Sequence, residues 1–221
     1  MLSIAMALLL VAGLGRTDVG AAGGEPKPKE RDGPSLQEQA VEHYNKGLKH
    51  RDKAWKYEKK AAEAEEDKDR GKNLKKARKE YEKAIKKQLA ATQKNPKFHE
   101  AFSSLGYAYR NIGDYESALE AYDSALSLAP NYAEAIEYRA EAYLGLNRVE
   151  EVQEAYEQLF VRDPGRAAEL IQAMKDWLDE QLQSEEDIAS EKLEKVQDWV
   201  VQKEKTAREM SGGAEEFQKE W

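Results

Sequence analysis

Hydrophobic residues recur along most of this chain at the three- and four-residue spacing of amphipathic helices. The pattern begins after Ser35 and continues, with short interruptions, to about residue 210. No stretch alternates apolar and polar residues as a half-buried strand does. The sequence therefore predicts an all-α protein.

The stretch from 98 to 164 repeats itself with a period of 34 residues, which Pro96, Pro130 and Pro164 mark. A fixed period of this length is typical of stacked helix–turn–helix units. We therefore expect two such units, at 98–131 and 132–165. The identical residues at this offset are Ala101 and Ala135, Tyr109 and Tyr143, and Tyr122 and Tyr156.

The first unit has residues suited to two closely packed helices. Gly106 and Ala118 are small at the positions where the two helices must approach closely. Gly113 can close the first helix in the left-handed conformation, and Asp114 can cap the second. The apolar face of the first helix consists of Phe102, Leu105 and Tyr109, and the second helix carries Tyr122 and Ala125 before Pro130.

These residues closely resemble the tetratricopeptide repeat, a helix–turn–helix motif whose copies stack into a right-handed solenoid. The second unit matches less well: Arg139 and Ala140 replace Leu105 and Gly106, and Asn147 replaces Gly113. Because Asn also tolerates the left-handed conformation, we expect the turn to survive.

The sequence on either side of these units predicts further helices. Residues 36–97 read as a basic helical hairpin and a degenerate first repeat, with Ser35 and Glu38 as a capping box and a break at Gly71. Residues 166–210 predict a capping helix pair, with a second capping box at Ser184 and Asp187, as the end of a solenoid requires. The helix is expected to stop at Gly212, so that residues 211–221 form a tail.

The amino terminus carries signals of export. Residues 2–15 are apolar but too few to span a bilayer, and 1–22 fit a secretory signal peptide, although no Lys or Arg precedes the apolar run. Residues 23–35 are rich in Pro, Gly and charge and are expected to be a flexible linker. We expect an exported, periplasmic or otherwise extracytoplasmic protein. The alternatives are an uncleaved amino terminus that contacts the membrane and a soluble chain that is not exported.

Charge is divided unevenly between the two halves of the chain, whose net charge is −8. Residues 46–97 hold 19 Lys and Arg against 9 Asp and Glu, whereas residues 98–221 hold 12 against 28. Such asymmetry has three interpretations: an anionic partner for the basic half, head-to-tail contact between molecules, or ordinary solvated helix faces. Binding of an anionic polymer or a membrane surface through the Lys-rich helices is the alternative function; nucleic acid is not expected as a partner.

The resemblance implies that the first helices of successive repeats line a concave groove that binds a protein or peptide. The acidic balance of these positions favours a basic or amphipathic partner segment, so the expected function is that of an adaptor or assembly scaffold. The positions that would line the groove are Glu100, Ser103, Tyr107 and Arg110 in the first unit and Glu134, Glu137, Tyr138 and Glu141 in the second.

Several other functions are disfavoured by the sequence. The repeats that grip acidic chaperone tails use a Lys/Asn/Arg clamp, and the matching positions here are Ser103, Tyr107, Glu134 and Tyr138. The chain contains no Cys, and His43 and His50 lack an evident third metal ligand. Phosphate-binding glycine loops and nucleophile motifs are also missing, so we expect no enzymatic activity, metal or cofactor.

Overall fold

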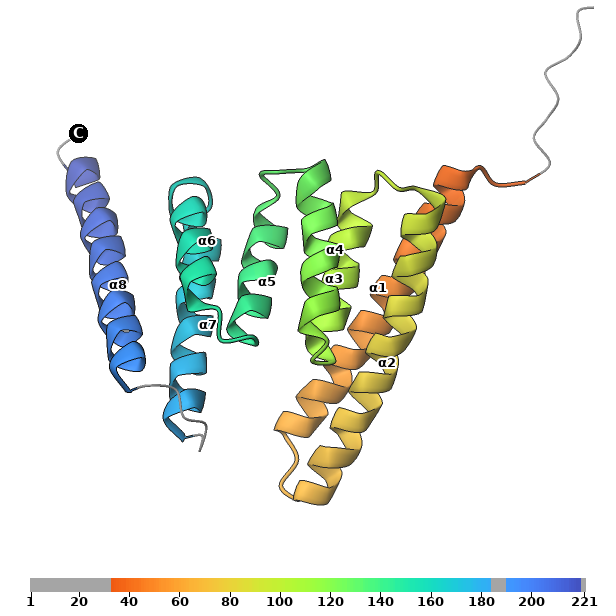
Figure 1. The fold of residues 1–221 in the computed structure, drawn as a ribbon, viewed down its shortest axis with the longest axis horizontal. Coiled ribbons are helices and arrows are strands. Elements are labelled where there is room, and N and C mark those ends of the chain that lie inside the picture. The colour runs from red at the N-terminus through yellow and green to blue at the C-terminus, as the bar shows by residue number, and fades with distance from the viewer. Residues whose placement is uncertain (1–32, 184–189, 220–221) are drawn as a thin grey trace, which may run out of the picture. The chain divides into compact units, whose positions relative to one another are not determined.

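The computed structural model describes residues 33–183 and 190–219, with side chains described up to residue 209. This part of the chain is helical and contains no strand (Figure 1). None of its helices is long and apolar enough to cross a membrane. The helices are α1 (Leu36–Ala62), α2 (Asp67–Lys94), α3 (His99–Asn111), α4 (Tyr115–Leu128), α5 (Ala133–Leu144), α6 (Val149–Arg162), α7 (Pro164–Gln183) and α8 (Ser190–Lys219).

Helices α1 and α2 form the predicted hairpin. The capping box is present: the Ser35 side chain accepts from the Glu38 backbone N–H at 3.2 Å, and the Glu38 carboxylate accepts from the Ser35 N–H at 2.7 Å. The expected break at Gly71 was wrong, because Gly71 lies inside α2 and the connection falls at residues 63–66. A single exposed glycine costs a helix only about 1 kcal/mol, too little to interrupt 28 residues.

The first predicted repeat corresponds to α3 and α4, and its small residues act as expected. Gly113 has a φ of +80°, and the Asp114 carboxylate accepts from the Ser117 backbone N–H at 3.3 Å. A β-carbon on Gly106 would lie 2.7 Å from the Tyr122 ring, so this close approach of α3 and α4 requires glycine.

The second predicted repeat corresponds to α5 and α6, and Asn147 performs the role of the turn glycine. Its φ is +57°, and its side-chain oxygen accepts from the Trp177 indole N–H at 3.1 Å. Pro164 is the first residue of α7, a position that tolerates its missing N–H.

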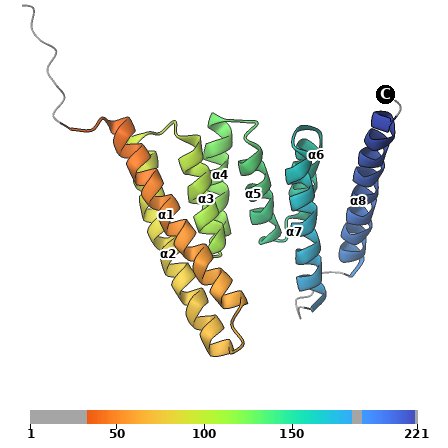
Figure 2. The ribbon, with the colours of Figure 1, turned by 180° about the vertical axis from the view of Figure 1, so that it is seen from behind.

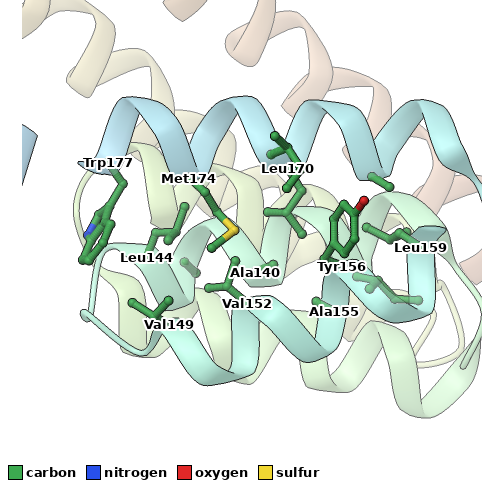
Figure 3. Close-up of a cluster of buried hydrophobic side chains, with 14 of the residues drawn as sticks. Ala140, Leu144, Val149, Val152, Ala155, Tyr156, Leu159, Leu170, Met174 and Trp177 are labelled. Carbon is green, nitrogen blue, oxygen red and sulfur yellow. The ribbon is translucent and has the colours of Figure 1, made fainter. Parts of the chain in front are cut away.

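Apolar side chains from α5, α6 and α7 meet in one cluster (Figure 3). Val152, Leu159, Leu170 and Met174 are almost completely buried there. Helix α8 packs on this unit through Trp199, whose ring meets that of Tyr156 at 5.1 Å. The expected stop at Gly212 was wrong, since α8 continues to Lys219; the expected capping box at Ser184 and Asp187 lies outside the described residues.

The first helices of the pairs pack side by side. Helix α1 contacts α3, α3 contacts α5, and α5 contacts α7, while each also packs on its own partner helix. Figure 2 shows the same succession of helices from behind. This arrangement brings the exposed sides of α1, α3, α5 and α7 together, as stacked repeats require.

Candidate functional site

The sequence-predicted groove residues lie on α3 and α5, but the structure does not expose all of them. Ser103 is completely buried, and among the described residues its hydroxyl has no hydrogen-bond partner. The Glu137 side chain is only 4% exposed. Ser103 therefore cannot contact a partner in this conformation. The other six are partly exposed: Glu100, Tyr107, Arg110, Glu134, Tyr138 and Glu141.

A row of aromatic rings connects three of the first helices. Trp55 of α1 donates its indole N–H to the Tyr107 hydroxyl of α3 at 2.7 Å. The ring of Tyr107 in turn meets that of Tyr138 of α5 at 5.2 Å. Trp55 remains 42% exposed. These rings provide a large contact area with polar groups at their edges.

Arginine side chains lie against the same rings. The Arg51 guanidinium stacks on Trp55, with its carbon 4.4 Å from the ring centroid. Arg110 lies 5.2 Å from Tyr107 and 5.4 Å from Tyr138, and Arg166 of α7 lies 5.9 Å from Tyr138. We call the surface formed by Arg51, Trp55, Tyr107, Arg110, Tyr138 and Arg166, with the carboxylates beside them, the first-helix face.

The three acidic residues predicted on α5 are paired with arginines of the same chain. Glu141 forms an ion pair with Arg110 of α3. Glu137 forms one with Arg166, whose other guanidinium nitrogen lies 3.7 Å from a Glu134 oxygen. These pairs connect α5 to both neighbouring first helices.

A further carboxylate, that of Glu169 on α7, adds negative charge beside these ion pairs. Burial raises the pKa of Glu137 to about 7; the pair with Arg166 opposes this rise, and the nearby Glu169 carboxyl adds to it. Burial also raises the pKa of Glu141, against Arg110 and with a contribution from Glu169. Glu134, Glu137, Glu141 and Asp163 thus share two guanidinium groups, Arg110 and Arg166, and the Glu169 carboxyl adds a further negative charge nearby. The centre of the face has an excess of negative charge.

Four residues of the first-helix face were not predicted from the sequence: Arg51, Trp55, Arg166 and Glu169. Helix α1 does not follow the 34-residue period, so the period could not align Trp55 with Tyr107. The i, i+4 spacing of Arg51 and Trp55 on an amphipathic helix was an available signal. Arg166 lies in the first turn of α7, where the repeat pattern had already faded.

The groups of the first-helix face are suited to binding a partner. Its aromatic and guanidinium groups stack on one another, and its carboxylates accept from arginines. In the part of the chain that the structure describes, no group of three His, Asp or Glu side chains could hold a metal ion. His50, considered above as a ligand, instead bonds Glu80 at 2.7 Å.

The family model of the tetratricopeptide repeat matches residues 99–132, which include α3 and α4. The chain therefore contains a tetratricopeptide repeat at residues 99–132. Repeats of this family generally form surfaces for protein–protein interaction, which supports a general role in such interactions. No curated protein matches this chain.

Two of the solved structures that resemble this chain are tetratricopeptide or related proteins of low identity. One is the first tetratricopeptide domain of Spaghetti (RPAP3), bound to the HSP90 peptide SRMEEVD: it is 22% identical, with a TM-score of 0.42, over 60% of this chain and 94% of that one. The other is the MamA protein, 19% identical with a TM-score of 0.34, over 58% of this chain and 96% of that one.

Proposed function

We propose that this protein is a non-enzymatic adaptor that holds a basic or amphipathic segment of a partner protein on its first-helix face. The observation that carries the proposal is that three carboxylates of α5 pair with only two guanidinium groups, while the Glu169 carboxyl of α7 lies beside them without an ion pair among the described residues. A lysine or arginine from a partner would supply the missing positive charge.

The partial burial of the carboxylates would strengthen their attraction to a cation of the partner. Charges interact more strongly away from bulk water, and Glu137 and Glu141 are both shielded by their neighbours. A cation placed beside Glu137 would lower its pKa from about 7 and release a proton. Binding through this contact would therefore strengthen as the pH rises through 7.

The aromatic row would provide the apolar part of the contact. Tyr, Trp and Arg are enriched at the residues that dominate binding energy in protein interfaces. Trp55, Tyr107 and Tyr138 are already held in place by a hydrogen bond and by stacked arginines, so little side-chain freedom would be lost on binding. An amphipathic segment could place its apolar side on this row and its cation at Glu137 and Glu169.

The test should remove negative charge without leaving a buried arginine unpaired. In the double variant Glu134→Gln, Glu169→Gln, Arg110 keeps Glu141 and Arg166 keeps Glu137. A matched control is Glu116→Gln, Glu120→Gln, which removes two exposed carboxylates from α4. Random peptides displayed on phage are selected against the wild-type chain, and the selected peptides are then titrated against both variants.

We expect the selected peptides to carry Lys or Arg and to bind the first double variant at least about tenfold more weakly, as loss of about 1.4 kcal/mol would produce. The α4 control should bind them as the wild type does. Selected peptides without basic residues, or equal binding to all three proteins, would refute the proposal. The acidic peptide SRMEEVD is the negative probe, and we expect it not to bind.

The location of the protein is a separate proposal that rests on sequence alone. Residues 1–22, which fit a signal peptide, lie outside the described residues. We propose that the mature chain is extracytoplasmic and begins near residue 23. Mass spectrometry of the mature amino terminus tests this, and an intact residue 1 on the recovered protein would contradict it.

A further inference from the structure

Five lysines form a straight row on the exposed side of α2. We call Lys68, Lys72, Lys75, Lys76 and Lys79 the lysine row; all are exposed. They recur at three- and four-residue steps, so they share one helix face. From Lys68 to Lys79 the row is about 16 Å long at 1.5 Å per residue.

The lysine row is not neutralised within the described residues. Lys68, Lys72, Lys75 and Lys79 have no ion pair there, and Lys76 only approaches the Tyr57 ring at 5.4 Å. Three carboxylates of α2 are engaged elsewhere: Asp67 pairs with Arg70, Glu80 bonds His50 and Lys83, and Glu82 lies 3.6 Å from Arg78. Like charges one helical turn apart repel each other, so an anionic partner would reduce the repulsion between these lysines.

The same chain carries an acidic surface with three- and four-residue steps, which forms no ion pair among the described residues; its Asp176 carboxylate accepts from the Gln172 amide at 2.8 Å. Asp176, Asp179 and Glu180 are exposed near the carboxyl end of α7, on the side opposite its buried residues; we call them the acidic end of α7. No basic residue occupies the last turn of α7, so these carboxylates add to the negative end of the helix dipole. The adjacent Lys175 does not neutralise them, because it pairs with Glu204 of α8 at 2.9 Å.

We propose that the lysine row of one molecule binds the acidic end of α7 of a second copy of this chain. Both surfaces present charges at one-turn steps, so two helices can align several opposite charges at once. The halves that carry them are also opposite in net charge, since residues 46–97 are basic and residues 98–221 acidic. A second copy is favoured over other anions for two reasons: its acidic helix end can align with the lysines, and its acidic half attracts the basic half of the first molecule over a longer range.

The contact joins two different surfaces, so it is heterologous and propagates head to tail. In the described residues, no ion pair connects α2 to α7 within one molecule. The contact does not involve the first-helix face. It uses other residues than the proposed peptide binding, and the substitutions Glu134→Gln and Glu169→Gln leave its charges in place, so the contact should persist in that variant.

The test is a charge exchange in the full chain. One variant is Lys72→Glu, Lys75→Glu, Lys79→Glu, and the other is Asp176→Lys, Asp179→Lys, Glu180→Lys. All six positions are exposed, so both variants should keep the wild-type circular dichroism spectrum and unfolding midpoint. Sedimentation velocity is measured for each variant alone, for their equimolar mixture and for the wild type, at low and at high salt.

We expect the wild type to associate at low salt and to dissociate as salt is added, with an affinity loss of at least about tenfold as screening shortens the range of the charges. Each variant alone should be monomeric, because its two surfaces have the same sign of charge. Their mixture should associate again, because the unchanged lysine row of one variant meets the unchanged acidic end of α7 of the other, and the two substituted surfaces are complementary as well. Association through apolar residues would persist or strengthen in sulfate, which separates the two causes.

A mixture that stays monomeric would overturn the proposal, as would a wild type that is monomeric at low salt. Vesicles containing anionic lipid and inorganic polyphosphate are titrated in parallel. If the wild type is monomeric but binds either of them, and the lysine variant does not, the row serves an anionic surface or polymer instead of a second copy.

Discussion

Arg166 at the start of α7 pairs with Glu137 in the middle of α5, and the Glu137 carboxylate is almost completely buried. The same guanidinium lies 3.7 Å from Glu134 and 3.7 Å from Asp163. One cation thus connects the helix after the second repeat to the first helix of that repeat. It also leaves Glu137 dependent on a single partner for its charge.

Removing this partner should destabilise the protein in a pH-dependent way. In Arg166→Met, an ionised Glu137 would be buried without a cation, and breaking such pairs costs about 3–5 kcal/mol. Because Arg166 is partly exposed, we expect a loss of about 2 kcal/mol at pH 8 and a smaller loss at pH 5.5, where Glu137 is protonated.

Urea unfolding at the two pH values measures both losses. The matched control is Arg78→Met, which breaks the exposed pair of Arg78 with Glu82 and should leave the unfolding midpoint unchanged at either pH. Equal losses for Arg166→Met at pH 5.5 and pH 8 would show that Glu137 does not depend on Arg166 for its charge.

Glu137 should itself make the stability fall as the pH rises. Its folded pKa of about 7 exceeds the usual 4.5, so between these values the folded state binds more protons than the unfolded state. The contribution of Glu137 to the free energy of unfolding is therefore largest below pH 4.5, and it is lost as the pH rises through 7.

The substitution Glu137→Gln removes this titration. From pH 4.5 to 8 the wild type should lose stability relative to Glu137→Gln, by on the order of 2 kcal/mol. Urea unfolding of both proteins across this range gives the difference. A constant difference would contradict the raised pKa; a wild type that gains stability relative to the variant would mean that the pKa is lowered.

The helices and the repeat turns could be predicted because their causes are local. The capping box at Ser35, the left-handed Gly113 and Asn147, and the close approach at Gly106 each follow from a few neighbouring residues and a fixed period. Propensity was a poorer guide at Gly71 and Gly212, where α2 and α8 continue through glycine. Long helices tolerate one or two such residues when the flanking turns are well formed.

The first-helix face could be predicted only in part, because its composition depends on packing between helices far apart in sequence. The period placed Tyr107, Arg110, Tyr138 and Glu141 on one surface, but it could not show that Arg110 pairs with Glu141. Trp55 reaches Tyr107 across 52 positions of sequence. Ser103 fits the pattern of a groove residue, yet the structure buries it completely.

The contact of Gly106 with Tyr122 predicts that Gly106→Ala destabilises the protein. The added β-carbon would lie 2.7 Å from the ring of a fully buried tyrosine, and overpacking of this kind costs about 1–3 kcal/mol. Gly71→Ala is the matched control, since nothing lies within 4 Å of its β-carbon, and it should stabilise α2 by about 0.5–1 kcal/mol. Denaturant unfolding compares them; two changes of the same sign would disprove the steric explanation.

The turn at Asn147 combines a backbone requirement with a side-chain contact, and substitutions can separate the two. Asn147→Gly keeps the positive φ but loses the bond from Trp177, so we expect a loss of about 1 kcal/mol. Asn147→Ala loses the bond and strains the backbone, which should roughly double the loss.

The double variant Asn147→Gly, Trp177→Phe tests the contact: if the bond is real, the two losses in unfolding free energy should sum to more than the loss of the double variant. Full additivity would mean that Trp177 stabilises α7 by packing alone and that Asn147 is needed only for its backbone conformation.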